Sequence, residues 1–194
     1  PMPEQEGYMQ LDVGIDTLGP CKVETKLPYG RFVGQDETVL INLSEDDLDD
    51  LPAEEAGKPH LCRFEKAGPR EHLYFDSSKT KCAIVTCGGL CPGINDVIRA
   101  IVMEAHHNYK VAATLGIRFG LEGFIPKYGH EVVELTPDIV STCHQFGGTI
   151  LGSSRGPQFS EDIVDALERM NISCLFMIGG DGTMRAAQQL MEEA

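Results

Sequence analysis

From Lys81 onward the sequence alternates short apolar runs with helical patterns, and this alternation constrains the fold more than any other feature. The apolar runs have the length of strands, and the segments between them have the spacing of helices, which is typical of βαβ units. The sequence therefore predicts an α/β fold of Rossmann-like type. We expect three layers, with a mostly parallel sheet covered by helices on both faces.

The apolar pattern also predicts the bounds of the individual elements. Strands are expected over residues 82–86, 111–117, 132–135 and 172–178, and helices over 95–108, 137–145, 160–170 and from 183 to the end. We expect Thr136 to cap the helix over 137–145 and Thr183 to cap the last helix. The strand over 172–178 is apolar except for Ser173 and is expected to be buried.

The first 80 residues have a different texture. Prolines interrupt them repeatedly, and only short strands such as 38–43 are expected. We therefore predict an irregular N-terminal extension over residues 1–80 and a separate folded part over residues 81–194. Nine carboxylates fall between Asp36 and Glu55 without a Lys or Arg among them, and we expect this acidic stretch to be a solvated loop.

Composition excludes several classes of partner. A formal charge of -14 argues against binding to nucleic acid or to an anionic membrane, because both need a basic surface. No apolar run approaches the roughly 20 residues that span a bilayer, and the first residues do not resemble a signal peptide. The cysteines number seven, and several lie in apolar runs, so we expect free thiols and a cytoplasmic protein.

Two glycine-rich turns follow expected strands. The turn Cys87–Gly93 follows the first strand, and the turn Gly179–Thr183 follows the last one. Ligands of open α/β sheets bind beyond the carboxyl ends of the strands. Glycine lacks a Cβ, so backbone N–H groups can approach phosphate oxygens, and the next helix adds its positive N-terminal end. An isolated pair such as Gly88-Gly89 is explained about equally well as a tight turn.

Two charged side chains make the prediction of a phosphate site more specific. Asp181 stands between glycines at a strand end, where a carboxylate can hold magnesium directly or through water. A third stretch, Gly147–Gly156, contains Arg155, whose planar guanidinium donates paired hydrogen bonds to phosphate. An acidic chain needs a local cation beside an anionic ligand, although a loop arginine is also commonly a solvated surface charge. We predict a site for the phosphates of a magnesium-nucleotide complex.

Together, and in this order, the three stretches resemble 6-phosphofructokinases of the phosphofructokinase A family. The family motifs Thr-x-Gly-Gly-x-x-Pro-Gly-x-Asn, Gly-Gly-Thr-x-Leu-Gly-Ser-x-Arg and Gly-Gly-Asp-Gly-Thr/Ser are matched by residues 86–95, 147–155 and 179–183. The resemblance covers residues 64–194. Residues 67–76 and the form of the first motif are similar to the branch found in plants, trypanosomatids and some bacteria, whose members often carry an N-terminal extension.

The resemblance implies an activity and a set of site residues. It implies transfer of the γ-phosphoryl group of ATP to the 1-hydroxyl of fructose 6-phosphate in glycolysis, with Mg²⁺ held by Asp181 and charge stabilised by Arg155. It implies that residues 81–194 are the nucleotide-binding part and that the enzyme is a homo-oligomer, a dimer or a tetramer. The nucleotide site is then lined by Gly89, Arg155, Gly156, Gly180, Asp181, Gly182 and Thr183.

The sequence departs from the family pattern at two places. Bacterial members have an allosteric effector site with basic residues on the first helix, where Arg99 matches one of them but Met103 stands where the next is expected. The motif Thr-Ile-Asp-Asn-Asp, which carries the family's catalytic base, is absent. We therefore expect an N-terminal fragment that is inactive alone.

Other interpretations remain open at this point. One is a pyrophosphate-dependent phosphofructokinase, although such members commonly have Asp at the position of Gly182. Another is an NAD kinase-like protein, since the Gly-Gly-Asp-Gly-Thr turn also occurs in NAD kinases and diacylglycerol kinases. A third is a non-catalytic nucleotide-binding subunit. A glycosomal or plastid location is the alternative to the cytoplasm.

Overall fold

The computed structural model describes residues 17–27, 30–34, 36–40 and 63–194. Contacts divide the described chain into two compact units. One unit comprises described residues of the first 74, and the other comprises residues 75–194 together with the segment 26–27. The division after residue 80 stays a prediction.

The first unit contains two short antiparallel pairs of strands. Strand β1 (Val23–Glu24) pairs with β4 (His72–Leu73), and β2 (Thr38–Leu40) pairs with β3 (Arg63–Glu65). Residues 41–43 of the expected strand lie outside the described residues, as do residues 41–55 of the acidic stretch. Within its described part, Glu37 pairs with Lys66 at 2.6 Å, and this hydrogen bond holds the pKa of the Glu37 carboxyl below its usual value.

The second unit is built on a four-stranded sheet with the order β7-β6-β5-β8. Strand β5 (Lys81–Thr86) runs parallel to β6 (Ala113–Ile117) and to β8 (Cys174–Ile178), while β7 (Val132–Glu134) is antiparallel to β6. Four short 3-10 helices accompany the sheet: η1 (Ser77–Lys79), η2 (Gly120–Phe124), η3 (Pro126–Tyr128) and η4 (Cys143–Gln145).

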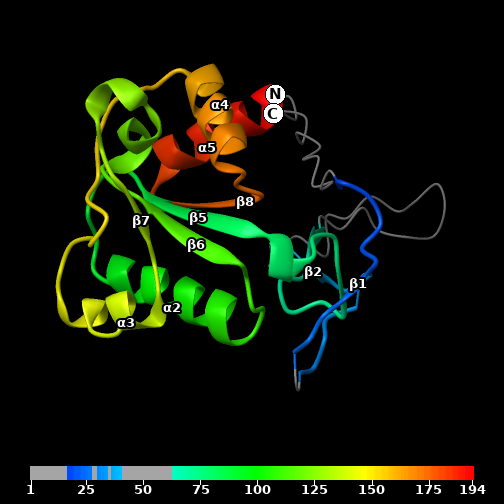
Figure 1. Ribbon diagram of the computed structural model, residues 1–194. Coiled ribbons are helices and arrows are strands. Elements are labelled where there is room, and N and C mark those ends of the chain that lie inside the picture. The colour runs from blue at the N-terminus through cyan, green and yellow to red at the C-terminus, as the bar shows by residue number, and fades with distance from the viewer. Residues whose placement is uncertain (1–16, 28–29, 35, 41–62) are drawn as a thin grey trace, which may run out of the picture. The chain divides into compact units, whose positions relative to one another are not determined.

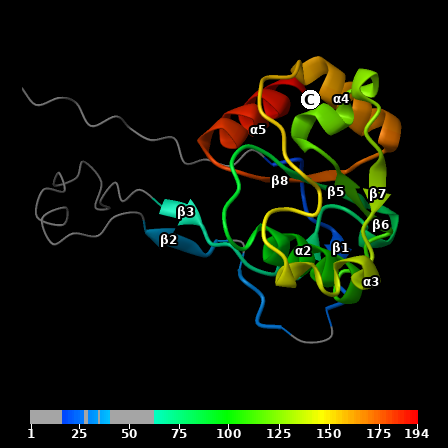
Figure 2. The same ribbon diagram turned by 90° about the vertical axis from the view of Figure 1, so that its left-hand side faces the viewer.

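Helices cover both faces of this sheet. Figures 1 and 2 show α2 (Ile94–His107) and α3 (Pro137–Val140) on one face, and α4 (Ser160–Met170) and α5 (Asp181–Glu193) on the other. The predicted three-layer α/β fold with a mostly parallel sheet is therefore confirmed. No helix in the described part of the chain is long and apolar enough to cross a membrane.

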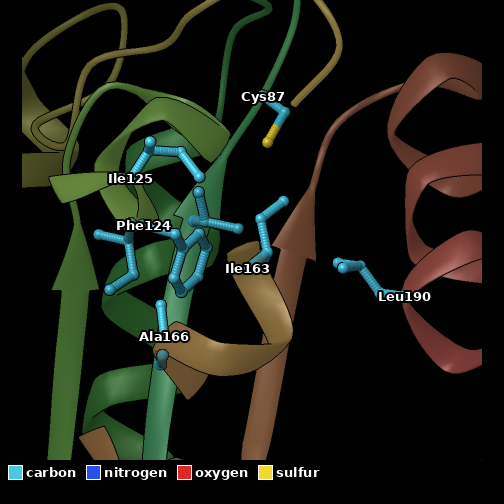
Figure 3. Packing of buried hydrophobic residues seen from close by; sticks show 9 residues of the cluster. Cys87, Phe124, Ile125, Ile163, Ala166 and Leu190 are labelled. Atoms are coloured by element: carbon cyan, nitrogen blue, oxygen red, sulfur yellow. The ribbon is translucent and has the colours of Figure 1, made fainter. Parts of the chain in front are cut away.

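Strand β5 lies at the centre of two hydrophobic clusters because its residues alternate between the faces of the sheet. Ala83 and Val85 belong to the cluster under α4 and α5, and Figure 3 shows this cluster with Phe124 and Ile163. Ile84 belongs to the cluster under α2 and α3. All three of these β5 residues are fully buried, which explains the unbroken apolar run that marked the strand in the sequence.

Several elements differ from the sequence-based expectation. Strand β6 begins at Ala113 rather than 111, and α5 begins at Asp181 rather than 183. The helix predicted over 137–145 is capped by Thr136 as expected but ends at Val140, and η4 follows it. Thr142 interrupts the helix with φ -116 and ψ 0, and the Cys143 thiol beyond it donates to the carbonyl of Asn95 on α2. The last strand begins at Cys174 and is only half-buried, because it forms an edge of the described sheet.

The expectation of free thiols agrees with the six cysteines that the structure describes, none of which forms a disulfide. Cys82 and Cys174 are opposite each other in the parallel pair β5 and β8. Cys62 lies outside the described residues.

Gly179, in the β8–α5 connection, lies close to the backbone at the end of β5. A Cβ built on Gly179 would lie 2.1 Å from the hydroxyl of Thr183 and 2.8 Å from the backbone oxygen of Cys87. The second of these neighbours is main chain at the end of β5, so it cannot turn away as a flexible side chain would. The connection can therefore pack against β5 only if residue 179 has no side chain.

We predict that Gly179→Ala lowers the free energy of unfolding by about 1–3 kcal/mol, because the added methyl group overlaps atoms that cannot all move away. Gly180→Ala is the matched control, since no described atom lies within 4 Å of a Cβ at that position and its φ of -97 suits any residue. Urea denaturation of both variants measures the difference. Equal midpoints for the two variants would contradict the packing argument.

Candidate functional site

The two glycine-rich turns lie next to each other at the carboxyl ends of β5 and β8. The backbone N–H of Cys87, directly after β5, donates to the carbonyl of Ile178 at 2.9 Å and so extends the parallel ladder by one step. Beyond this bond the chains turn into α2 and α5. Gly88 and Gly93 take φ values of 77 and 91, which only glycine adopts at little cost. The first turn therefore needs these two glycines for its shape.

The third glycine-rich stretch is bonded to the first turn. The N–H of Gly88 donates to the carbonyl of Ser154 at 3.3 Å, and the Ser153 hydroxyl donates to the carbonyl of Gly88 at 2.6 Å. Both backbone groups of Gly88 are thus used within the protein. Gly89 is exposed, and a Cβ on it would meet no described atom within 4 Å. Gly89 can therefore face a ligand, whereas Gly88 supports the turn.

The turn after β8 differs from expectation in one respect. Helix α5 begins at Asp181 and its N-cap is Gly180, so Thr183 is the third helical residue and does not cap the helix. The N–H of Thr183 donates to the carbonyl of Gly180 at 2.9 Å, and its side chain is buried with the hydroxyl beside Gly179. Sequence reasoning failed here because an N-cap residue must stand outside the helix, whereas the helix already includes Thr183.

Gly180 and Gly182 leave open space around Asp181. A Cβ on either glycine would meet no described atom within 4 Å apart from its chain neighbours and, for Gly182, the backbone of its own helix, and all three residues are exposed. The N-terminal end of α5 carries the partial positive charge of the helix dipole and N–H groups without helical partners. An anionic group can therefore reach this turn without meeting a side chain.

Asp181 is the residue of the second turn that could hold a metal ion. Its carboxylate forms no ion pair within the described residues, and no group of three or more His, Cys, Asp or Glu side chains within them could enclose a metal. Mg²⁺ does not need such a cage, because it keeps several waters and commonly takes one or two carboxylates plus substrate phosphates. A single exposed carboxylate between two glycines with open space around them fits that requirement.

Arg155 directly follows the residue that is bonded to Gly88, so the main chain carries it to the first turn. Its side chain is exposed and forms no ion pair with the described carboxylates. Gly156 has a φ of 111 and open space around it. The chain therefore leaves the guanidinium free to turn toward a ligand.

Cys87 lies beneath the first turn and is not a reactive group. Burial raises the pKa of its thiol to about 11, although a hydrogen bond from the backbone N–H of Leu121 acts in the opposite direction. The thiol is therefore neutral near pH 7 and packs in the cluster under α4 and α5. Cys87 is therefore a packing residue, as the apolar run before it suggests, whereas Cys91 in the same turn is exposed.

Thr86 and Asn95 are the first and last residues of the first family motif, but the sequence pattern predicted no role for either. Both are almost completely buried, with exposed fractions of 1% and 2%, and their side chains bond to the third glycine stretch and to Phe146 just before it. The sequence signal that could have identified them is a hydroxyl residue at one end of a glycine turn and an amide residue at the other. Buried polar groups of this kind need hydrogen-bond partners. Their partners lie more than 50 residues away, so spacing alone could not identify them.

Comparison with known proteins relates this chain to one family. A family model described as phosphofructokinase matches residues 81–194. A protein of Borreliella burgdorferi named ATP-dependent 6-phosphofructokinase is 41% identical over 190 residues, which is 94% of this chain and 41% of that protein. A protein of the same name from Trypanosoma cruzi is 48% identical over 136 residues, covering 70% of this chain and 28% of the relative. The chain thus spans less than half the length of these relatives.

Solved structures agree with this relation. The structure of phosphofructokinase from Saccharomyces cerevisiae is 28% identical with a TM-score of 0.53, over 59% of this chain and 16% of that one. A pyrophosphate-dependent phosphofructokinase from Marinobacter aquaeolei has a TM-score of 0.53 at 18% identity, over 59% of this chain and 30% of that one, and shows the fold alone. The family match covers more than half of the chain, and from it we conclude that this chain belongs to the phosphofructokinase family.

Proposed function

We propose that this chain carries the magnesium-ATP site of an enzyme that phosphorylates fructose 6-phosphate at its 1-hydroxyl, giving fructose 1,6-bisphosphate. The observation that carries the proposal is that three glycine stretches meet at the carboxyl ends of β5 and β8. Hydrogen bonds join the first turn to the third stretch through Gly88, and the ladder joins it to the turn after β8 through Cys87. The names of the relatives support the choice of ATP and of the sugar phosphate.

In this proposal the phosphates of ATP are held mainly by backbone groups. Gly89, Gly180 and Gly182 offer N–H groups in open space, and the end of α5 adds its dipole. Thr183 lies at the back of the turn, where its buried position supports Gly180. Arg155 and Gly156 close the site from the third stretch, with the guanidinium as the positive charge.

The chemical step is a phosphoryl transfer. The bond between the γ-phosphorus and the bridging oxygen of ADP breaks, a bond forms to the 1-hydroxyl oxygen of the sugar, and the hydroxyl proton leaves to a general base. Mg²⁺ held by Asp181 would neutralise charge on the β- and γ-phosphates. Arg155 stabilises the negative charge on the equatorial oxygens and holds them in line through its planar fork.

Gly182 is proposed to select ATP as the donor. It stands in the first turn of α5, where no described atom would contact an added Cβ. An aspartate there would put a second carboxylate beside Asp181, in the space proposed for the nucleotide's α-phosphate. Pyrophosphate has no α-phosphate linked to a nucleoside, so a pyrophosphate-dependent enzyme tolerates that charge. The pyrophosphate-dependent structural neighbour makes this donor the alternative to test.

We further propose that residues 81–194 form the nucleotide-binding part, that residues 1–80 form an extension, and that the enzyme is a homo-oligomer in the cytoplasm. The family match over residues 81–194 supports the first of these. A related protein of Arabidopsis thaliana is named chloroplastic, so a plastid location is the alternative for the compartment. Light scattering of the full-length protein measures the oligomeric state.

A coupled assay tests the proposed function directly. Full-length protein is supplied with fructose 6-phosphate and Mg²⁺ and with either ATP or pyrophosphate, and formation of fructose 1,6-bisphosphate is followed. The proposal expects turnover with ATP and far less with pyrophosphate. Turnover with pyrophosphate alone would establish the alternative donor, and no turnover with either would leave a non-catalytic nucleotide-binding protein.

We predict that Gly182→Asp lowers kcat/KM for ATP about 100-fold, because placing like charges side by side costs several kcal/mol and each 1.4 kcal/mol is a factor of about ten. Gly182→Ala adds bulk without charge at a helical position and should lose far less. Steady-state kinetics of both variants give the comparison. Unchanged ATP kinetics in Gly182→Asp would contradict the proposal that Gly182 selects ATP as the phosphoryl donor.

We predict that Arg155→Gln lowers kcat with ATP by about 10²- to 10³-fold, the usual loss when one charge-stabilising donor is removed from a transition state. Arg155→Lys keeps the charge but loses the paired donors, so it should recover only part of the rate. Arg169→Gln is the control, because Arg169 is an exposed residue in the last turn of α4. Similar kcat values for the two glutamine variants would exclude the role proposed for Arg155.

A further inference from the structure

A chain of hydroxyl groups joins the end of β5 to the stretch that precedes Arg155. The Thr86 hydroxyl lies 2.6 Å from the carbonyl oxygen of Gly152 and 2.9 Å from the hydroxyl of Thr149. The backbone N–H of Leu151 donates to the Thr149 hydroxyl at 3.2 Å. The carbonyl of Gly152, the two hydroxyls and the N–H of Leu151 thus form one chain of hydrogen bonds, although Thr86 is more than 60 residues from the others in the sequence.

Counting protons fixes the direction of this chain. A carbonyl oxygen can only accept, so the one hydroxyl proton of Thr86 points to Gly152. The Thr86 oxygen must then accept from the Thr149 hydroxyl, whose own oxygen accepts from the N–H of Leu151. Every donor in the chain has an acceptor, and such a chain strengthens each of its bonds by polarisation.

Asn95 fixes the other end of the same stretch. Its side-chain amide donates to the carbonyl of Phe146 at 2.9 Å, and its side-chain oxygen accepts from the N–H of Ile150 at 2.9 Å. The two bonds span the Gly147-Gly148 turn. Because one partner is a carbonyl and the other an N–H, only one orientation of the amide satisfies both.

The stretch from 146 to 154 is thus held at both ends by side chains from β5 and α2. Gly88 adds the bonds to Ser153 and Ser154, the last residues before Arg155. None of these bonds uses the guanidinium, which is exposed. The framework therefore determines where the backbone of residue 155 starts, while the side chain remains free to meet a ligand.

We propose that Thr86 and Asn95 are positioning residues, which hold the 146–154 stretch so that Arg155 reaches the phosphate groups bound at the glycine turns. This inference rests on the proposed function, because it gives both residues a role that acts through Arg155. Displacing a charge-stabilising group by about 1 Å can cost about 100-fold in rate. Loss of the Thr86 hydroxyl therefore lowers kcat even though Thr86 touches no substrate.

The test compares full-length variants that differ by a single hydroxyl or methyl group. Thr86→Val removes the hydroxyl and keeps the shape, and it should lower kcat with ATP by about 10- to 100-fold. Thr86→Ser keeps the hydroxyl and should recover most of that loss. Thr149→Val removes the donor to Thr86 and the acceptor of the Leu151 N–H but keeps the bond from Thr86 to Gly152, so it should give a smaller loss in the same direction. This variant keeps the test open if Thr86→Val fails to fold.

Thr80→Val is the matched control. Thr80 is also a buried threonine whose hydroxyl donates to a backbone carbonyl, that of Asp76 at 2.8 Å. It stands just before the amino end of β5, whereas the glycine turns lie at the carboxyl ends of the strands. The control should lose stability without a loss of kcat. A kcat in Thr86→Val equal to that in Thr80→Val would overturn the proposal.

A double-mutant comparison separates positioning from a general structural effect. If Thr86 acts through Arg155, Thr86→Val costs much less kcat in an Arg155→Lys background than in the unmodified enzyme. Equal losses in the two backgrounds would overturn the proposal, because the two residues would then act independently.

A readout that needs no activity distinguishes this inference from the proposed function. Hydrogen exchange of the ligand-free protein should speed up in residues 146–154 of Thr86→Val and not in those of Thr80→Val. An unmodified protein that is inactive with ATP and pyrophosphate would remove the proposed function, whereas unchanged exchange in Thr86→Val would remove the framework on which the inference depends.

Discussion

The hydrogen bond from the N–H of Cys87 to the carbonyl of Ile178 holds the ends of β5 and β8 together, and the arrangement of the glycine stretches depends on it. It continues the parallel ladder beyond the last residue of β5, so the two turns begin from neighbouring points. Gly179 then packs directly against the Cys87 backbone. The absence of a side chain at residue 179 is therefore a condition for bringing the turns together, in addition to any contact with a ligand.

The glycines of the site have unequal tasks. Gly88 and Gly179 serve the protein itself, one by bonding to the third stretch and the other by allowing close packing. Gly89, Gly180 and Gly182 have open space where a side chain would stand. A sequence motif does not distinguish between these five glycines. The structure separates the glycines that build the turns from those that leave open space beside them.

The sequence predicted the fold well where the pattern was local and strong. The apolar run of β5 and the amphipathic spacing of α2 placed these elements within one residue of the observed bounds at both ends. Errors arose where distant contacts decide the outcome. The helix expected to reach residue 145 ends at Val140, and the segment beyond it packs onto α2 through the Cys143 thiol. Thr183 lies inside α5 because that helix starts two residues earlier than its pattern indicated.

The same limit applied to the candidate site. Its glycines, Asp181 and Arg155 could be singled out because their chemistry is visible residue by residue. The role proposed for Thr86 and Asn95 could not, because a buried hydroxyl or amide acts only through its partner, and those partners lie in another part of the sequence. In the proposed site an acidic chain would bind an anionic ligand with backbone dipoles and the exposed guanidinium of Arg155 rather than with a cluster of cations. Backbone dipoles act only if the loops that carry them are held in place, so buried polar side chains that tie one loop to another are as much a part of such a site as the groups that face the ligand.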